Sequence, residues 1–292
     1  MKSTRKTFFG FGILLCLSLI FSACQKDAST TNNPKAARQL SVYLTDDPCQ
    51  YDSVFIDIRY VEVKIDTTKE HMDDDNFGDR DDDGDDDHRD HDNFGKWDTL
   101  TIRPGVYNVL QLRNGLDTLL GTANIPAGKI RKIRLTLGTN NSLVKDGVSH
   151  PLNLLAGTNN YVYIKIHNED EDDVTTAQTA IWLDFDVCRS IKLINGQYYL
   201  KPVLKPFGKK NFGEIEGKVL PDAAHAFVTA QNTSDSASAM PEHDGEYKIR
   251  GLREGTYSLK FKGSAGYKDT TISNIQVQKG KETKVPTITL HL

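Results

Sequence analysis

Short segments rich in Val, Ile, Leu and Tyr recur along most of the chain, and turn residues separate them. This pattern restricts the fold most, because apolar residues that alternate with polar ones have the period of a half-buried β-strand. The clearest example places Ile181, Leu183 and Phe185 on one face and Trp182 and Asp184 on the other. Many short strands at regular spacing predict an all-β protein, either a β-sandwich or a barrel. We expect two antiparallel β-sandwich domains in tandem.

The segments fall into two groups. The first group of predicted strands covers 40–44, 52–65, 97–102, 106–112, 129–137, 161–166, 179–191 and 198–206. In the long second strand the apolar parity changes, which predicts a bulge near Arg59–Tyr60. A leucine-bearing stretch at 112–121 is the one candidate helix. The polar residues 207–212 are expected to form a hinge, so that domains at 40–207 and 213–292 follow one another in tandem.

The overall composition limits the class of protein. The chain has 292 residues, 36 Lys and Arg against 40 Asp and Glu, and 38% hydrophobic residues. At about 150 residues per domain this length suits two folded units, and the apolar content is sufficient for real cores. The formal net charge is −4, so the chain has no excess of basic residues. Sequence-independent binding of nucleic acid needs a concentrated basic face, and we therefore expect no nucleic-acid partner.

The N-terminus has the pattern of an export signal. Basic Lys2, Arg5 and Lys6 precede the apolar run 8–21, whose 14 residues are too few to cross a hydrocarbon core about 30 Å thick. The run ends in FSAC, and this resembles the lipobox of bacterial lipoproteins, with Cys24 as the lipidated residue. An ordinary secretory signal with a chance Cys is the alternative.

The resemblance to lipoproteins implies a location and a membrane partner. Residues 1–23 would be the signal peptide, and residues 24–39 would be the lipidated Cys with a flexible tether. Gln25 stands where Asp would favour retention in the inner membrane. We therefore expect anchoring in the outer membrane through palmitate and the other acyl chains.

Two cysteines remain in the exported part, Cys49 and Cys188. An even number of Cys in an oxidising envelope predicts a disulfide. The alternatives are two free buried thiols, or metal ligation, for which two Cys without neighbouring His are too few.

Three groups of residues resemble a known family in their order along the chain. They are LSVYLTDDP at 40–48 with YDSVFIDI at 51–58, IPAG at 125–128 before IRL at 133–135, and LDFD at 183–186 with RSI at 189–191 and YLKPV at 199–203. Together they look like DUF4382, a domain of unknown function common in bacterial lipoproteins. The resemblance implies an exported β-rich domain and carries over no active site.

The C-terminal region resembles a second family. Gly245, Tyr247 and Ile249 begin a G-x-Y-x-I-x-G-L pattern, and Gly255 and Tyr257 begin the G-x-Y-x-L pattern that follows. Gly suits tight turns, and the aromatic residues suit the inside of a small sandwich. The region looks like a carboxypeptidase regulatory-like module, which implies a prealbumin- or transthyretin-like sandwich. Relatives of this fold include carbohydrate-binding modules, an analogy that is weak evidence for function.

An acidic insert interrupts the first domain at about 70–95. Residues 73–92 contain 12 Asp, too polar to bury a core. One frame matches the spacing of a calcium loop and supplies six ligands with Gly84 at the sharp turn. These ligands are Asp79, Asp81, Asp83, Asp85, Asp87 and Asp90. A disordered, solvated acidic loop is the alternative interpretation, and Zn²⁺ or Cu²⁺ at His88 and His91 is a weaker one.

Two other acidic groups are notable. A Cys49–Cys188 bond would bring Asp46 and Asp47 near Asp184 and Asp186, where they could hold a cation or cap strand ends and turns. The run at 169–173 is expected to form a solvated hairpin tip. Trp182, opposite the core face, could stack on a sugar or pack beneath a loop.

These features support three hypotheses about function. The first is a non-enzymatic, membrane-anchored surface lipoprotein that binds a glycan or a protein or acts as a scaffold. The second is a calcium-binding structural or adhesion protein that uses the Asp-rich insert. The third is a carbohydrate-active hydrolase, for which paired carboxylates such as Asp184 would be needed, although no nucleophile elbow or HExxH motif is present. The ligand itself is not specified by any motif.

Overall fold

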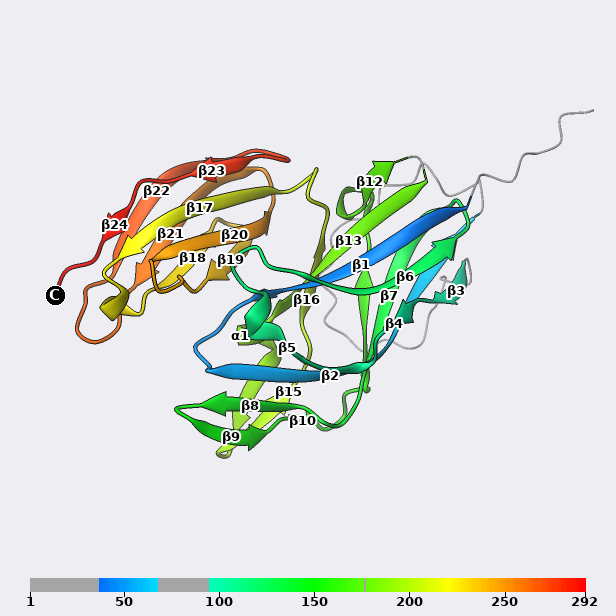
Figure 1. Ribbon diagram of the computed structural model, residues 1–292, viewed down its shortest axis with the longest axis horizontal. Helices are drawn as coiled ribbons and strands as arrows, with labels where there is room; N and C mark the ends of the chain where they lie inside the picture. The colour runs from blue at the N-terminus through cyan, green and yellow to red at the C-terminus, as the bar shows by residue number, and fades with distance from the viewer. Residues whose placement is uncertain (1–36, 68–94, 176) are drawn as a thin grey trace, which may run out of the picture. The chain divides into compact units, whose positions relative to one another are not determined.

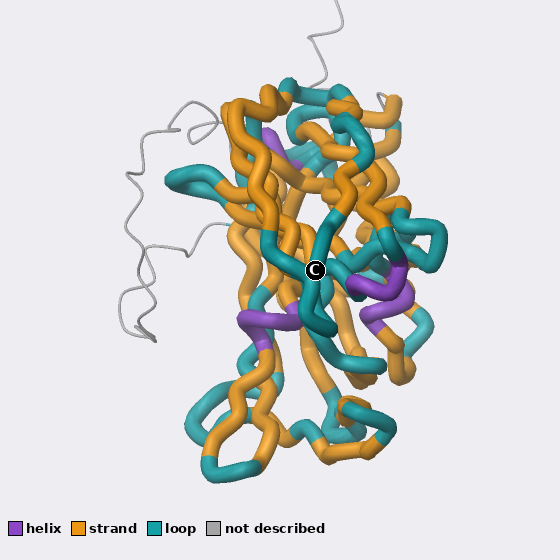
Figure 2. The backbone as a smooth tube through the Cα atoms, turned by 90° about the vertical axis from the view of Figure 1, so that its left-hand side faces the viewer, coloured by secondary structure: helices purple, strands orange, loops and turns teal. Residues whose placement is uncertain are grey.

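The computed structural model describes residues 37–67, 95–175 and 177–292, and nearly all its regular elements are strands (Figure 1). Helix is confined to a few short turns, which Figure 2 shows in purple. The described residues form one compact unit. The all-β prediction is confirmed.

Two large sheets and one small sheet form the first module. One has the strand order β12-β13-β1-β6-β4, and β16 also pairs with β13. Its strands are β1 (Arg38–Asp47), β4 (Thr101–Ile102), β6 (Thr118–Ile125), β12 (Asp172–Thr175), β13 (Gln178–Asp186) and β16 (Leu204–Phe207). Most pairs are antiparallel, but β1 and β13 run parallel, with Asp47 opposite Asp186.

The second sheet has the order β11-β7-β2-β8-β9, and β3 and β5 also pair with β2. Its strands are β2 (Ser53–Asp66), β3 (Lys96–Thr99), β5 (Gly105–Asn108), β7 (Lys129–Leu137), β8 (Ser142–Lys145), β9 (Val148–Pro151) and β11 (Tyr161–Lys165). A small third sheet consists of β10 (Asn153–Leu154), β14 (Ile191–Ile194) and β15 (Gln197–Leu200). The register of β2 with β7 shifts between Ile58 and Tyr60, which confirms the predicted bulge.

The core of the first module lies between its two large sheets. Alternate residues such as Val42 on β1, Val63 on β2 and Leu135 on β7 are fully buried in one apolar cluster. On β13, Leu183 belongs to this cluster, as its parity predicts. The opposite face of β13 is buried too, because Trp182 packs in a separate aromatic cluster.

Two short elements differ from the prediction. The prediction of a helix at 112–121 is wrong. A 3₁₀ turn ends at Leu112, and the next turn has left-handed φ angles at Asn114 and Gly115. Strand β6 then follows. The predicted strand 179–191 is interrupted after β13 by the turn α1 (Val187–Ser190). The Asp186 carboxylate causes this change, since it accepts the Arg189 backbone N–H at 2.7 Å and caps the turn.

Two segments expected to be solvated are anchored. The prediction of a polar hinge at 207–212 is wrong at both ends of the segment, because Phe207 and Phe212 are buried against each other. The solvated tip at 169–173 is also wrong. Asp170 and Asp172 are buried, and their carboxylates accept backbone N–H groups of His167 and Lys210.

The second module is a small sandwich of two sheets. One sheet contains β17 (Gly213–Leu220), β20 (Glu246–Leu252), β23 (Glu282–Lys284) and β24 (Ile288–Thr289); the other contains β18 (Phe227–Gln231), β19 (Ser236–Ala239), β21 (Gly255–Lys262) and β22 (Thr270–Val277). Tyr247 and Tyr257 are buried in the core between them. The prediction from the two glycine–tyrosine patterns is therefore confirmed.

Candidate functional site

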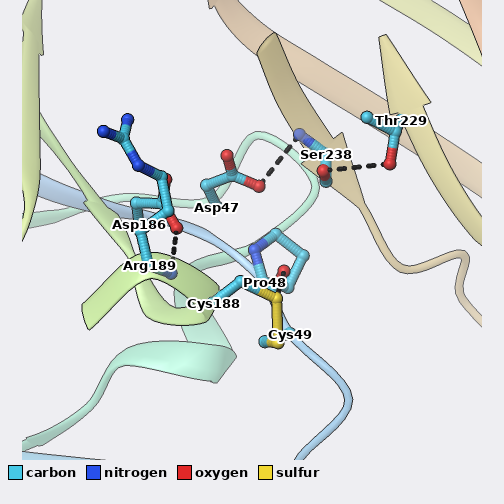
Figure 3. The surroundings of a disulfide bond; sticks show 8 residues. All are labelled: Asp47, Pro48, Cys49, Asp186, Cys188, Arg189, Thr229 and Ser238. Carbon is cyan, nitrogen blue, oxygen red and sulfur yellow. Dashed lines mark hydrogen bonds and ion pairs between the residues drawn. A yellow bond between two sulfur atoms is a disulfide. The ribbon is translucent and has the colours of Figure 1, made fainter. Parts of the chain in front are cut away.

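A disulfide joins the ends of β1 and β13. Because these strands run parallel and in register, the residues that follow them leave the sheet side by side. Cys49 and Cys188 are bonded there with a Cα–Cα distance of 5.0 Å (Figure 3). The predicted disulfide is confirmed, and it closes a loop with a sequence separation of 139 residues.

Four aspartates gather beside this bond, as the sequence predicted for a bonded pair. Two have structural roles: Asp47 accepts the backbone N–H of Ser238 at 2.9 Å (Figure 3), and Asp186 caps the turn after β13. Ser238 belongs to β19, so Asp47 connects the first module to the second. The other two, Asp46 and Asp184, are almost completely buried.

Burial dominates the electrostatics of these carboxylates. It raises the pKa of Asp46 well above its ordinary value, and the neighbouring Asp184 adds to this effect. Burial also raises the pKa of Asp184 to about 7, against the attraction of Lys205. Neither oxygen of Asp46 has a hydrogen-bond partner within the described part of the chain. Carboxyl groups with such a pKa could act as general acids if a substrate could reach them.

The space around these two carboxylates is too small for a substrate. The cavity that both line, together with Asn114 and Arg250, has a volume of about 10 Å³. This is room for one water molecule at most. The geometry therefore favours a structural role for Asp46 and Asp184 over catalysis.

Trp182 has a structural role as well. Its ring stacks on Tyr43 at a centroid distance of 5.0 Å, and the Lys209 ammonium lies 4.2 Å from the ring centroid. Its Nε1 donates to Asp117 at 2.9 Å. Trp182 is only 7% exposed, so the hypothesis that it stacks on a sugar is wrong. The alternative, that it packs beneath neighbouring residues, is confirmed.

Arg250 on β20 completes this network from the second module. Its guanidinium is buried, donates to the Gly115 carbonyl, and lies 3.2 Å from the Asp117 carboxylate and 3.3 Å from Glu214. Burial alone would raise the pKa of Asp117, but the hydrogen bond from Trp182 and the charges of Lys209 and Arg250 outweigh it and lower that pKa.

A second ion pair connects the modules. Lys205 on β16 pairs with Asp235, which also accepts the Tyr257 hydroxyl at 2.8 Å and the Arg253 backbone N–H at 2.9 Å. Burial would raise the pKa of Asp235, but Lys205 lowers it overall. Sequence analysis missed both ion pairs, because no spacing or motif marks residues that meet only through the tertiary fold.

Two recesses lie next to this region. One, of about 210 Å³, is lined by His225 and His243, and the other, of about 320 Å³, by Asp52 and Asn108. They share Arg113 and Glu242, an ion pair with a 3.6 Å separation. Arg113 and Glu242 offer hydrogen-bonding groups of opposite charge to a small ligand, while most of the lining of the first recess is apolar.

Several predicted site residues lie outside the described residues. Cys24 and the residues of the Asp-rich insert belong to this group, including Asp79, Asp81, Asp83, Asp85, Asp87, Asp90, His88 and His91. Lipidation at Cys24 and calcium binding by the insert remain predictions. Among the residues that the structure does describe, no three His, Cys, Asp or Glu side chains are grouped so that they could hold a metal ion. The described helices are all too short to span a bilayer.

Two family models match the chain. The model for a domain of unknown function, DUF4382, matches residues 38–202, and that for the carboxypeptidase regulatory-like domain matches residues 215–291. Both resemblances expected from the sequence are confirmed. None of the curated proteins matches the chain.

Solved structures give weak likenesses. A type II cohesin–X-dockerin complex from Acetivibrio cellulolyticus is 23% identical over 27% of this chain and 56% of its own, with a TM-score of 0.23. A minor pilin of Streptococcus agalactiae is 12% identical over 87% of this chain and 95% of its own, with a TM-score of 0.20. A shaft pilin of Lactobacillus rhamnosus GG is 10% identical over 87% of this chain and 98% of its own, with a TM-score of 0.23. Scores of this size carry no argument about function.

Proposed function

The chain belongs to the DUF4382 family, and from this premise we propose that it is a non-catalytic lipoprotein of the bacterial outer membrane whose two β modules act as one binding or scaffolding unit. The Cys49–Cys188 disulfide is the observation that carries the proposal. Disulfides are characteristic of compartments outside the cytosol, where they form and persist. The bond therefore supports an exported protein.

The N-terminal sequence supports the mode of attachment. The basic start, the apolar run 8–21 and the small residues before Cys24 suit recognition and lipidation in the envelope. Residues 25–39 have the composition of a flexible spacer between the lipid and the first strand.

The contacts between the modules support the scaffolding role. The Arg250–Asp117 ion pair, the Lys205–Asp235 ion pair and the Ser238–Asp47 hydrogen bond all join the first module to the second. Buried ion pairs and hydrogen bonds hold their partners in one geometry. Two modules held in this way present a fixed surface to a ligand, which is what a binding or scaffolding unit needs.

Metabolic labelling with palmitate tests the anchor. The full-length protein, produced in a bacterium that processes lipoproteins, is expected to carry the label and to fractionate with the outer membrane. Cys24→Ala should lose both, because its thiol is the proposed site of acylation. Cys16→Ala is the matched control, since Cys16 lies inside the signal peptide, and it should keep both.

Two outcomes would contradict the proposal. If Cys24→Ala is labelled and fractionates like the unmodified protein, Cys24 is not an anchor. If the purified protein turns over glycosidase or esterase substrates and Asp184→Asn abolishes the turnover, the non-catalytic part is wrong.

A further inference from the structure

The outer face of β3, β2, β7 and β11 carries three rows of cross-strand neighbours. The rows are Trp97–Lys64–Lys132–Lys165, Thr99–Glu62–Arg134–Tyr163 and Tyr60–Thr136–Tyr161. The intervening residues Val63, Ile133 and Ile164 are buried in the core. Because side chains alternate between the two faces of a strand, the three rows point away from the core. We call them the aromatic–basic face.

Three aromatic rings on this face are contiguous, and two of its tyrosines are exposed. The Trp97 and Tyr163 centroids are 5.9 Å apart, and those of Tyr163 and Tyr161 are 5.1 Å apart. Tyr163 is 47% exposed, and Tyr60, in the third row, is 58% exposed. A contiguous exposed apolar patch, unlike single scattered apolar residues, marks an interaction surface.

Arg134 holds this face in a fixed arrangement. Its Nε and Nη2 donate to the two carboxylate oxygens of Glu62 at 2.6 and 2.5 Å. The guanidinium carbon lies 4.9 Å from the Trp97 ring centroid and 5.8 Å from that of Tyr161. A bidentate ion pair combined with cation–π contacts restricts all four side chains. The rings of Trp97 and Tyr161 are therefore held in place before any ligand arrives.

Positive charge is available at one end of the face. Arg134 is paired with Glu62, but the ammonium of Lys165 is exposed at the end of the first row. A lysine ammonium next to flat apolar rings complements a ligand that has negative groups beside flat apolar faces.

From this combination we propose that the aromatic–basic face binds an acidic polysaccharide, with sugar rings stacked on Tyr163 and Tyr60 and acidic groups beside Lys165. The C–H faces of a pyranose ring are flat and apolar, and its substituent carboxylates or sulfates provide the negative charge. The inference rests on the proposed binding role and names the ligand class and the surface.

A nucleic acid is also anionic and has rings that stack. The disulfide and the export-like N-terminal sequence favour the polysaccharide, because the proposed export would put the face in the envelope. An acidic peptide would satisfy the charges but supplies few flat faces for the exposed rings.

Titration calorimetry with the purified mature protein tests the proposal. The probe is polygalacturonate, and dextran, polyglutamate and single-stranded DNA serve as the neutral, peptide and nucleic-acid comparisons. Polygalacturonate is expected to bind more tightly than all three, and more weakly at high salt, because salt screens exposed charges. Removal of one exposed ring, in Tyr163→Ala or in Tyr60→Ala, should weaken binding about 2- to 10-fold.

Two further variants sharpen the test. Lys165→Gln should weaken the binding of polygalacturonate and should reduce the salt dependence of that binding. Tyr199→Ala on β15 is the matched control, since it removes a tyrosine from another sheet. It should bind within about twofold of the unmodified protein, and circular dichroism should show that every variant is folded.

The proposal is overturned if polygalacturonate does not bind, if dextran, polyglutamate or DNA binds as tightly, or if Tyr163→Ala and Tyr60→Ala both bind as the unmodified protein does. It is also overturned if binding appears only after the aspartates of 73–92 are changed to asparagine, because the chain's own acidic segment would then be the occupant. Palmitate labelling decides the lipoprotein proposal independently, so the two can fail separately.

Discussion

At the scale of single residues, the buried carboxylates beside the disulfide are the most unusual feature. Asp46 and Asp184 lie in the same small cavity, and burial raises the pKa of both. A carboxyl group that is protonated more readily in the folded state favours folding at low pH. Its contribution is complete below the ordinary pKa of about 4 and is lost as the pH rises through the folded pKa.

We predict that Asp184→Asn flattens the pH dependence of stability. For the unmodified protein, the free energy of unfolding should fall as the pH rises from 4 to 7, since the pKa of Asp184 is about 7 when folded. In the variant, residue 184 cannot ionise. The decrease in the free energy of unfolding between pH 4 and pH 7 should therefore be smaller by roughly 2–4 kcal/mol. Urea unfolding at a series of pH values measures the difference.

Asp146→Asn is the matched control for this prediction. Asp146 is exposed in the turn between β8 and β9, where it has a left-handed φ that Asn also tolerates. Its profile should run parallel to that of the unmodified protein. A parallel profile for Asp184→Asn would show that this carboxylate ionises alike in the folded and unfolded chains.

At the scale of elements, the alternation of apolar and polar residues identified most strands, and the backbone conformation of a turn explains where the prediction failed. Val54, Val61 and Val63 lie on β2 as predicted, with the bulge that their change of parity required. In the stretch 112–121, leucines suggested a helix, but Asn114 and Gly115 take left-handed conformations. Leu119 and Leu120 then alternate between exposed and buried, as residues in a strand do.

The contacts between modules were beyond prediction from the sequence. The clustering of Asp46 and Asp184 followed from the disulfide, because bonded cysteines fix the ends of their strands. No comparable constraint pointed to Arg250 and Asp117, which lie 133 residues apart. A charged residue on a strand usually faces water, and only the tertiary fold shows that Arg250 does not.

We predict that loss of the disulfide destabilises the first module strongly. The Cys49→Ser/Cys188→Ser variant leaves a loop of 139 residues open, and chain entropy then favours the unfolded state by up to about 5 kcal/mol. Urea unfolding of the variant measures this loss, and reduction of the unmodified protein should reproduce it. Equal midpoints with and without reductant would show that the bond adds no stability.

At the scale of the whole molecule, the two modules are coupled through buried polar contacts. Phe207 and Phe212, at the ends of the connecting segment, pack with Trp182, and Arg250 joins Asp117 next to the indole. Modules that share such contacts should unfold in one cooperative transition.

We predict that Arg250→Ala uncouples the modules. The change leaves Asp117 without one of its cationic partners and should cost about 3 kcal/mol, as removal of one partner from a buried pair does. Calorimetry should then record two transitions where the unmodified protein has one. Proteases should also cut more readily between residues 207 and 213.

Lys260→Ala is the control, since its ion pair with Asp269 is half exposed. It should change stability by less than about 1 kcal/mol and keep a single transition. One transition for Arg250→Ala as well would mean that the aromatic cluster is sufficient to couple the modules.

The parallel pairing of β1 with β13 also determines when the first module can be completed. A chain emerges from its N-terminus, so β1 is available long before residues 178–186 arrive to cover its open edge. Until then the edge offers unpaired amide and carbonyl groups that attract other strands. The nascent protein therefore passes through a period of vulnerability to aggregation. This period ends when the last large strand docks and an oxidant can link the two cysteines.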